Sequence, residues 1–126
     1  RKATPIGARI NEPFHQLIQA NGYDHNYVID GEMGTLRKAA QAYSPTSGIS
    51  MDVETTLPGL HFYAANFLDA GLTGKKGAVY GPRYAFCLET QFFPDAVNQP
   101  AFPSVILKPD GVYDHTTVFS FCCVKG

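Results

Sequence analysis

The sequence has little cysteine and no long hydrophobic run, and these two absences exclude several classes of protein. Its three cysteines are Cys87, Cys122 and Cys123. An odd number with two adjacent members does not make a disulfide framework, and the spacing matches no zinc site. We expect free, mostly buried thiols in a reduced cytoplasmic protein. Apolar residues never run long enough to span a bilayer.

The chain also lacks an excess of charge of either sign. Ten Lys and Arg residues face eleven Asp and Glu residues, for a net charge of −1. This balance gives no electrostatic reason to expect a nucleic acid or a membrane surface as partner. The glycine-rich stretch Leu68–Gly81 contains no Gly-Lys-Ser/Thr order, so it predicts a loop rather than a phosphate cradle.

The N-terminus lacks two further features. It starts Arg1-Lys2-Ala3, without an initiator Met and without the apolar core of a signal peptide. We therefore expect the chain to begin inside a longer polypeptide.

Short apolar runs separated by proline and glycine predict an all-β protein. Nine Pro and twelve Gly are spread evenly along the chain. A single short helix is predicted over Phe14–Ala20, with a cap and first-turn proline at Asn11-Glu12-Pro13. The predicted strands are His25–Ile29, Leu36–Ser44, Ile49–Leu57, Leu60–Leu68, Ala78–Tyr80, Phe86–Phe93, Ser104–Lys108 and Val112–Val124.

Two of these strands indicate how they are buried. In Ile49–Leu57, apolar and polar residues alternate, which predicts a strand with one buried face. Leu60–Leu68 is more apolar and is expected to be covered on both faces.

Glu89 stands in the middle of an apolar predicted strand. If it faces the core side, its charge needs partners, and a carboxylate held in a dry cleft can act as a general base. Alternatively it points to solvent, opposite the face that carries Phe86, Leu88 and Thr90. The residues alone leave both interpretations open.

A second carboxylate lies in a turn. Asn21-Gly22 leads into Tyr23-Asp24-His25, which presents an acid and an imidazole together. Asp24 could bind a ligand, or it could cap backbone amides of the turn. A metal site is not favoured, because one Asp-His pair lacks a third ligand with suitable spacing.

These segments, taken together, resemble the aldose 1-epimerase family, the galactose mutarotases. The resemblance covers nearly all of the chain in family order, over the runs Gly22–Asn26, Tyr63–Leu68, Gly74–Tyr80, Cys87–Gln91, Pro94–Pro100, Phe102–Ser104, Leu107–Pro109 and Tyr113–Thr117. It implies the C-terminal part of one large antiparallel β-sandwich domain, spanning residues 1–126. It also implies interconversion of the α and β anomers of hexoses such as galactose and glucose, without cofactor or metal.

The resemblance assigns roles to three residues. Glu89 would be the general base that takes the anomeric hydroxyl proton, and Asp24 would bind sugar hydroxyls. His61 stands where many relatives have Gln, a side chain that can contact the sugar, so His61 would keep that hydrogen bond or change sugar preference. The family's acid histidine belongs to the N-terminal portion, and none of the four histidines here matches its motif. That portion is the expected partner of this chain, as a missing segment or a second chain.

Three functions remain to be compared. Glu89 favours an active mutarotase, because a protein that only binds sugar does not need a base. The absence of the acid histidine favours a non-catalytic carbohydrate-binding protein for this chain alone. A structural β-domain whose motifs only hold loops is the third. Most of the seven Tyr and nine Phe residues are expected in the core, although some could stack on a sugar ring.

Overall fold

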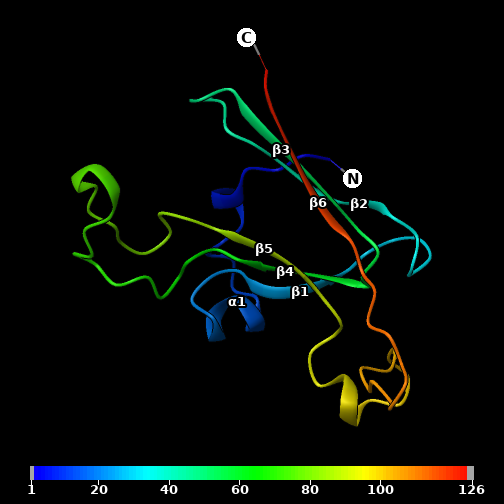
Figure 1. Ribbon diagram of the computed structural model, residues 1–126. Coiled ribbons are helices and arrows are strands. Elements are labelled where there is room, and N and C mark those ends of the chain that lie inside the picture. The colour runs from blue at the N-terminus through cyan, green and yellow to red at the C-terminus, as the bar shows by residue number, and fades with distance from the viewer. Residues whose placement is uncertain (1, 125–126) are drawn as a thin grey trace. The chain divides into compact units, whose positions relative to one another are not determined.

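The protein is all-β, as the sequence predicts. The computed structural model describes residues 2–124 and contains six strands and one short α-helix in this range (Figure 1). The strands are β1 (Asp24–Val28), β2 (Arg37–Tyr43), β3 (Ile49–Thr55), β4 (Gly59–Tyr63), β5 (Cys87–Gln91) and β6 (Thr117–Cys123). The helix α1 spans His15–Gln19, and three single 3-10 turns cover Ile6–Ala8, Lys75–Gly77 and Ala96–Asn98.

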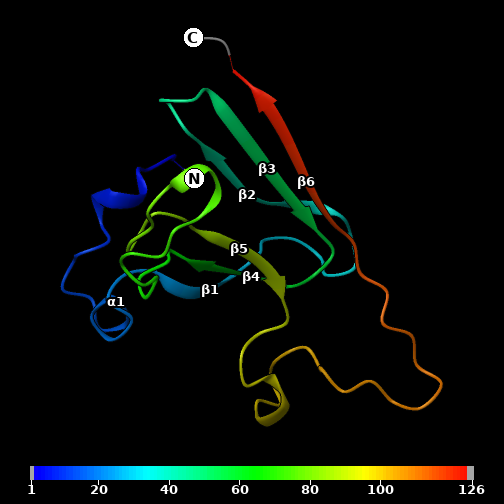
Figure 2. The same ribbon diagram turned by 60° about the vertical axis from the view of Figure 1, so that its left-hand side comes forward.

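The strands form two sheets of three. One has the order β1-β4-β5, and the other has the order β2-β3-β6. The second is antiparallel, and Figure 2 shows its strands side by side. Val53 lies opposite Ala40 on one side and Phe119 on the other, and a bulge interrupts β2 between Lys38 and Ala40.

The chain divides into two compact units. Among the described residues, the first contains residues 2–26 together with His61–Glu89, and the second contains Tyr27–Leu60 and residues 90–124. Each has its own small core. The buried apolar residues are Ile10, Leu17, Ala64 and Ala65 in the first, and Ile29, Val53, Leu57, Leu60 and Ala96 in the second.

A row of hydroxyl groups supports the second unit. Thr55 is fully buried, and its Oγ1 lies 3.1 Å from Oγ1 of Thr117. The same Thr117 oxygen lies 2.6 Å from Oγ1 of Thr90. These hydroxyls satisfy one another in the interior, where an unpaired polar group would be costly.

The predicted helix is present but its predicted cap is wrong. The residue before α1 is Phe14, which makes no side-chain capping bond. Asn11 instead accepts a hydrogen bond from Nη1 of Arg83 at 3.0 Å. The helix therefore depends on the burial of Leu17 rather than on a polar cap.

Three predicted strands are shorter than expected or absent. Ala78–Tyr80 makes one isolated bridge, between Thr73 and Val79, because a 3-10 turn with left-handed Lys76 precedes it. Ser104–Lys108 is not a strand, and Oγ of Ser104 accepts the Ile106 amide in a local turn contact. The run predicted over Val112–Val124 pairs only from Thr117 onward.

The expected burial is confirmed for part of the predicted strand Leu60–Leu68 and wrong for the thiols. Leu60, Ala64 and Asn66 are buried, whereas Phe67 is 63% exposed. All three cysteines are free, as predicted, but exposed. Cys122 and Cys123 lie on β6, which ends the order β2-β3-β6 and therefore has a neighbouring strand on one side only. Among the described residues, no helix has the length and apolar character needed to cross a membrane.

Candidate functional site

Asp24 and His61 form the polar contact at the centre of the candidate site. Asp24 is the first residue of β1, and His61 is the middle residue of β4, the neighbouring strand. Oδ1 of Asp24 lies 2.6 Å from Nε2 of His61, and both side chains are half-buried. This carboxylate oxygen therefore contacts an imidazole and does not cap backbone amides, which was the alternative interpretation of Asp24.

The turn before β1 sets the position of Asp24. Asn21 and Gly22 both have positive φ, 52° and 134°. The amide of Gly22 donates to the carbonyl of Leu17 at 2.9 Å, which ties the turn to α1. The carbonyl of Tyr23 accepts two hydrogen bonds, from the Ala64 amide at 3.0 Å and from Nδ2 of Asn66 at 2.9 Å. The backbone on the N-terminal side of Asp24 is therefore held at several points.

Asn66 is a residue whose role the sequence did not reveal. It is buried and lies in the run Tyr63–Leu68. Its only sequence signal is a polar side chain inside an otherwise apolar run. Its Nδ2 donates to the Tyr23 carbonyl, so it helps to hold the turn before Asp24.

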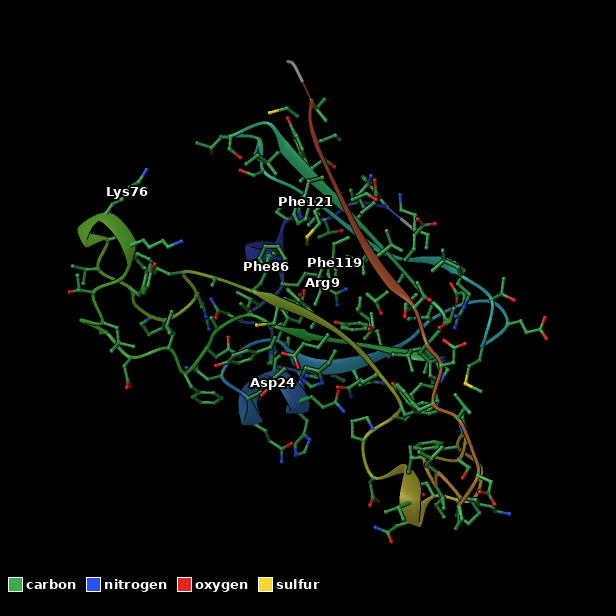
Figure 3. The ribbon with its side chains drawn as sticks, viewed as in Figure 1. Arg9, Asp24, Lys76, Phe86, Phe119 and Phe121 are labelled. Atoms are coloured by element: carbon green, nitrogen blue, oxygen red, sulfur yellow. The ribbon has the colours of Figure 1, made fainter. Side chains whose placement is uncertain are left out.

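Ring contacts define one face of the sheet β1-β4-β5. Tyr23 contacts Phe62 with ring centroids 5.2 Å apart, and Phe62 contacts Phe86 at 6.1 Å. Because successive residues of a strand point to opposite faces, the residues next to these aromatics point the other way. Those neighbours are Asp24, His61 and, by the same alternation along β5, Cys87 and Glu89. Alternation thus brings the three predicted site residues to one face (Asp24 and Phe86 are labelled in Figure 3).

Glu89 itself is exposed, and its strand neighbours agree with this orientation. Leu88 and Thr90 are half-buried, and Thr90 makes its hydroxyl contact with Thr117 inside the second unit. Cys87, two residues away, shares the face of Glu89. Loss of solvation raises the pKa of the Cys87 thiol, and the charge of Glu89 and a hydrogen bond to it raise that pKa further.

His25 belongs to the aromatic face, not to the face of Asp24. Its ring meets Tyr23 edge-on at 6.0 Å, and its Nδ1 accepts the Asp24 amide at 3.2 Å. The acid and the imidazole that are adjacent in the sequence therefore point apart. Within residues 2–124, no group of three or more His, Cys, Asp or Glu side chains is arranged to hold a metal ion.

A pocket of about 470 Å³ also lies in the first unit, with Phe86 in its wall. Arg83 belongs to this wall as well, and its guanidinium is bound to Asn11 and to the carbonyl of Asn21. Neither Asp24 nor His61 nor Glu89 lines it. The pocket is therefore separate from the carboxylate-bearing face.

Comparison with known proteins identifies the family. The model of the aldose 1-epimerase family matches residues 1–120. The chain belongs to the aldose 1-epimerase family. It is 49% identical to bovine galactose mutarotase and 47% identical to the human protein, in each case over 121 residues, which are 96% of this chain. Aldose 1-epimerase of Escherichia coli is 30% identical over 105 residues, 82% of this chain and 30% of that protein.

A solved structure agrees. A crystal structure of an aldose epimerase homologue from C. elegans matches with a TM-score of 0.67 and 34% identity, over 81% of this chain and 30% of that one. The chain spans about one third of the bovine and human relatives, 34% in each case. The comparisons therefore establish the family and the β fold of this chain, but not the activity of a complete epimerase, because the chain matches only about one third of these relatives.

Proposed function

We propose that this chain supplies the base and part of the sugar-binding surface of an aldose 1-epimerase that acts on hexoses such as galactose and glucose. The observation that carries the proposal is the order β1-β4-β5, on which strand alternation assigns Asp24, His61 and Glu89 to one face, together with the contact between Asp24 and His61. The family relationship supports the same activity.

Each residue then has a chemical task. The carboxylate of Glu89 accepts the proton of the anomeric hydroxyl while an acid protonates the ring oxygen, so the C1–O5 bond opens to the aldehyde. Rotation about C1–C2 turns the carbonyl, and the reverse proton transfers close the ring on its other face. Asp24 and His61 hold sugar hydroxyls during this sequence. Little charge develops, so these steps need no metal or redox cofactor.

The acid in this scheme comes from outside the chain. We propose that residues 1–126 are the C-terminal portion of one mutarotase-like β-sandwich domain, completed by an N-terminal portion in the same or a second polypeptide, in the cytoplasm. The edge strand β6 supports this. Phe119 and Phe121 are 46% and 67% exposed and lie on the same side of β6 (Figure 3). β6 contains no charged residue, although charged side chains are one of the features that keep an exposed sheet edge from pairing with another strand.

The catalytic proposal is tested in a complete protein. In bovine galactose mutarotase, the matching third is replaced by this chain, and mutarotation of freshly dissolved α-D-galactose is followed by polarimetry. Glu89→Gln keeps the shape but not the proton acceptor, so turnover should fall by about 10²–10⁴-fold. Asp24→Asn should also weaken sugar binding, by about 1–3 kcal/mol.

The outcomes separate the alternatives. Full turnover in the Glu89→Gln protein would show that the base is elsewhere. Sugar binding without turnover in the unmutated chimera would favour the non-catalytic carbohydrate-binding alternative. The isolated chain should have little or no activity, because the acid is missing.

The docking proposal has a separate test. Phe121→Lys places a charge on the exposed face of β6, and Lys2→Ala changes a residue far from it in the sequence. The complementary two thirds of the bovine protein, mixed with the chain, should be retained by the unmutated chain and by Lys2→Ala but not by Phe121→Lys. Equal retention of all three would show that the edge of β6 is not the docking surface.

A further inference from the structure

Arg83 forms hydrogen bonds to three separate segments of the first unit. Its Nη1 donates to Oδ1 of Asn11 at 3.0 Å, and its Nη2 donates to the carbonyl of Asn21 at 3.0 Å. Its backbone amide donates to the carbonyl of Ala65 at 2.9 Å. One residue in the approach to β5 therefore holds the loop before α1, the turn after α1 and the segment after β4.

Two of these contacts lead to the backbone that precedes Asp24. The side chain of Arg83 binds the Asn21 carbonyl, which lies in the turn that enters β1. The amide of Arg83 binds the segment 64–66, and this segment donates twice to the Tyr23 carbonyl, at 3.0 and 2.9 Å. Arg83 therefore supports the turn before Asp24 by two routes, one through its side chain and one through its backbone.

The backbone conformation of Arg83 also indicates a specific role. Arg83 has φ of 67°, and Ala65, whose carbonyl it binds, has φ of 50°. Residues other than glycine rarely adopt this left-handed region. They persist there where surrounding contacts fix the backbone, and they are concentrated at functional sites.

We propose that Arg83 is a positioning residue, which fixes the turn that places Asp24 on the sugar-binding face and does not itself touch the sugar. The inference rests on the proposed function, in which Asp24 binds sugar hydroxyls. An arginine suits this task because its planar guanidinium holds its donors in a fixed geometry and can bind two acceptors at once. Replacing the side chain leaves the amide contact with Ala65 available, so we expect a misplaced carboxylate rather than an unfolded chain.

The first measurement uses the bovine chimera that contains this chain. Arg83→Met should raise KM for galactose about three- to tenfold, as expected when one hydrogen bond no longer fixes the turn. The value of kcat should stay within about twofold, because the change concerns binding and not the base. Arg83→Lys keeps a charged donor without the planar fork, so it should recover part of the affinity.

Arg37→Met is the matched control for a loss of stability alone. Arg37 belongs to the second unit, where its guanidinium binds backbone carbonyls. The same substitution there should destabilise the chimera but leave KM unchanged at a temperature where circular dichroism shows the protein folded. A KM that rises equally in both variants would overturn the inference.

A double-mutant cycle shows whether Arg83 acts through Asp24. In the Asp24→Asn chimera, the carboxylate that the turn positions is already lost. Adding Arg83→Met should then raise KM by less than about twofold further. Full additivity of the two substitutions would overturn the inference, because Arg83 would then affect binding by another route.

Hydrogen exchange measures the contact in the full chain by itself, independently of activity. The Gly22 amide donates to the Leu17 carbonyl at 2.9 Å and reports on the turn that Arg83 holds. In Arg83→Met it should exchange about tenfold faster, because the turn opens more often. The amides of β3, which lies in the other sheet, should exchange at unchanged rates.

The outcomes separate this inference from the proposed function. Faster exchange at Gly22 with an unchanged KM would show that Arg83 stabilises the turn without positioning the site, and would leave the proposed function standing. Unchanged exchange at Gly22 would show that these bonds do not hold the turn, which also overturns the inference alone. An unmutated chimera that neither binds nor converts galactose would overturn the proposed function, and the inference with it.

Discussion

Gly22 should tolerate a side chain poorly, because two separate penalties meet there. Its φ of 134° lies in a region that L-residues rarely adopt. A Cβ at this position would lie 2.9 Å from Cγ of Asn66 and closer still to its Oδ1. Asn66 is only 3% exposed and donates to the Tyr23 carbonyl, so it has little room to move.

The two penalties can be given rough sizes. A residue held in a sparsely populated backbone region costs about 1–3 kcal/mol. Inserting a carbon into a filled site costs about 1–3 kcal/mol more. Gly22→Ala should therefore lower the free energy of unfolding by roughly 2–6 kcal/mol, measured by urea denaturation followed by circular dichroism.

Two other glycines separate these contributions. Gly71 has φ of 96° but nothing within 4 Å of an added Cβ, so Gly71→Ala should show the backbone penalty alone, about 1–3 kcal/mol. Gly7 has neither feature, and Gly7→Ala should change stability by less than about 0.5 kcal/mol. In a double-mutant cycle, Asn66→Ala should relieve part of the Gly22→Ala penalty. A Gly22→Ala protein as stable as Gly71→Ala would refute the packing argument.

Two further predictions concern side chains whose surroundings are well defined. Cys87 should react with iodoacetamide at pH 8 more slowly than Cys122 and Cys123, because its raised pKa leaves less thiolate. Glu89→Gln removes the negative charge that contributes to this rise and should accelerate the reaction of Cys87 alone; equal Cys87 rates in both proteins would contradict the electrostatic contribution. Arg37 donates to four backbone carbonyls, those of Asp30, Thr35, Thr55 and Leu57, at 3.0–3.2 Å. Arg37→Met should lower the free energy of unfolding in urea by about 2–4 kcal/mol, because these carbonyls lose their donor. A decrease below about 0.5 kcal/mol would show that water replaces the guanidinium.

The strands that the sequence predicts well are those with a strong local pattern. β3 follows its predicted start at Ile49, and β5 lies within its predicted range. The errors have physical causes outside that pattern. Ser104–Lys108 has strand composition, but none of the described strands pairs with it, and composition cannot supply a partner. The prediction of buried thiols was wrong for the same reason. Burial of these cysteines depends on which other elements cover β6 and the exposed face of β5, and their local sequence does not show this.

The candidate site shows a similar limit, because it depends on the order of strands rather than on any one of them. Asp24, His61 and Glu89 are 37 and 28 residues apart along the chain, and their local patterns left both carboxylates ambiguous. Exposure alone would not resolve Glu89, which faces solvent whether or not it is a base. The order β1-β4-β5 resolves part of the question, since it makes the strands of these residues neighbours and lets the Tyr23, Phe62 and Phe86 rings mark the opposite face. The contact between Asp24 and His61 depends on that strand order, and the spacing of the two residues in the sequence does not predict it. Inserting one residue between Phe86 and Cys87, at the start of β5, should reverse the alternation; it should therefore abolish Glu89-dependent turnover in the chimera while leaving the Asp24–His61 contact intact.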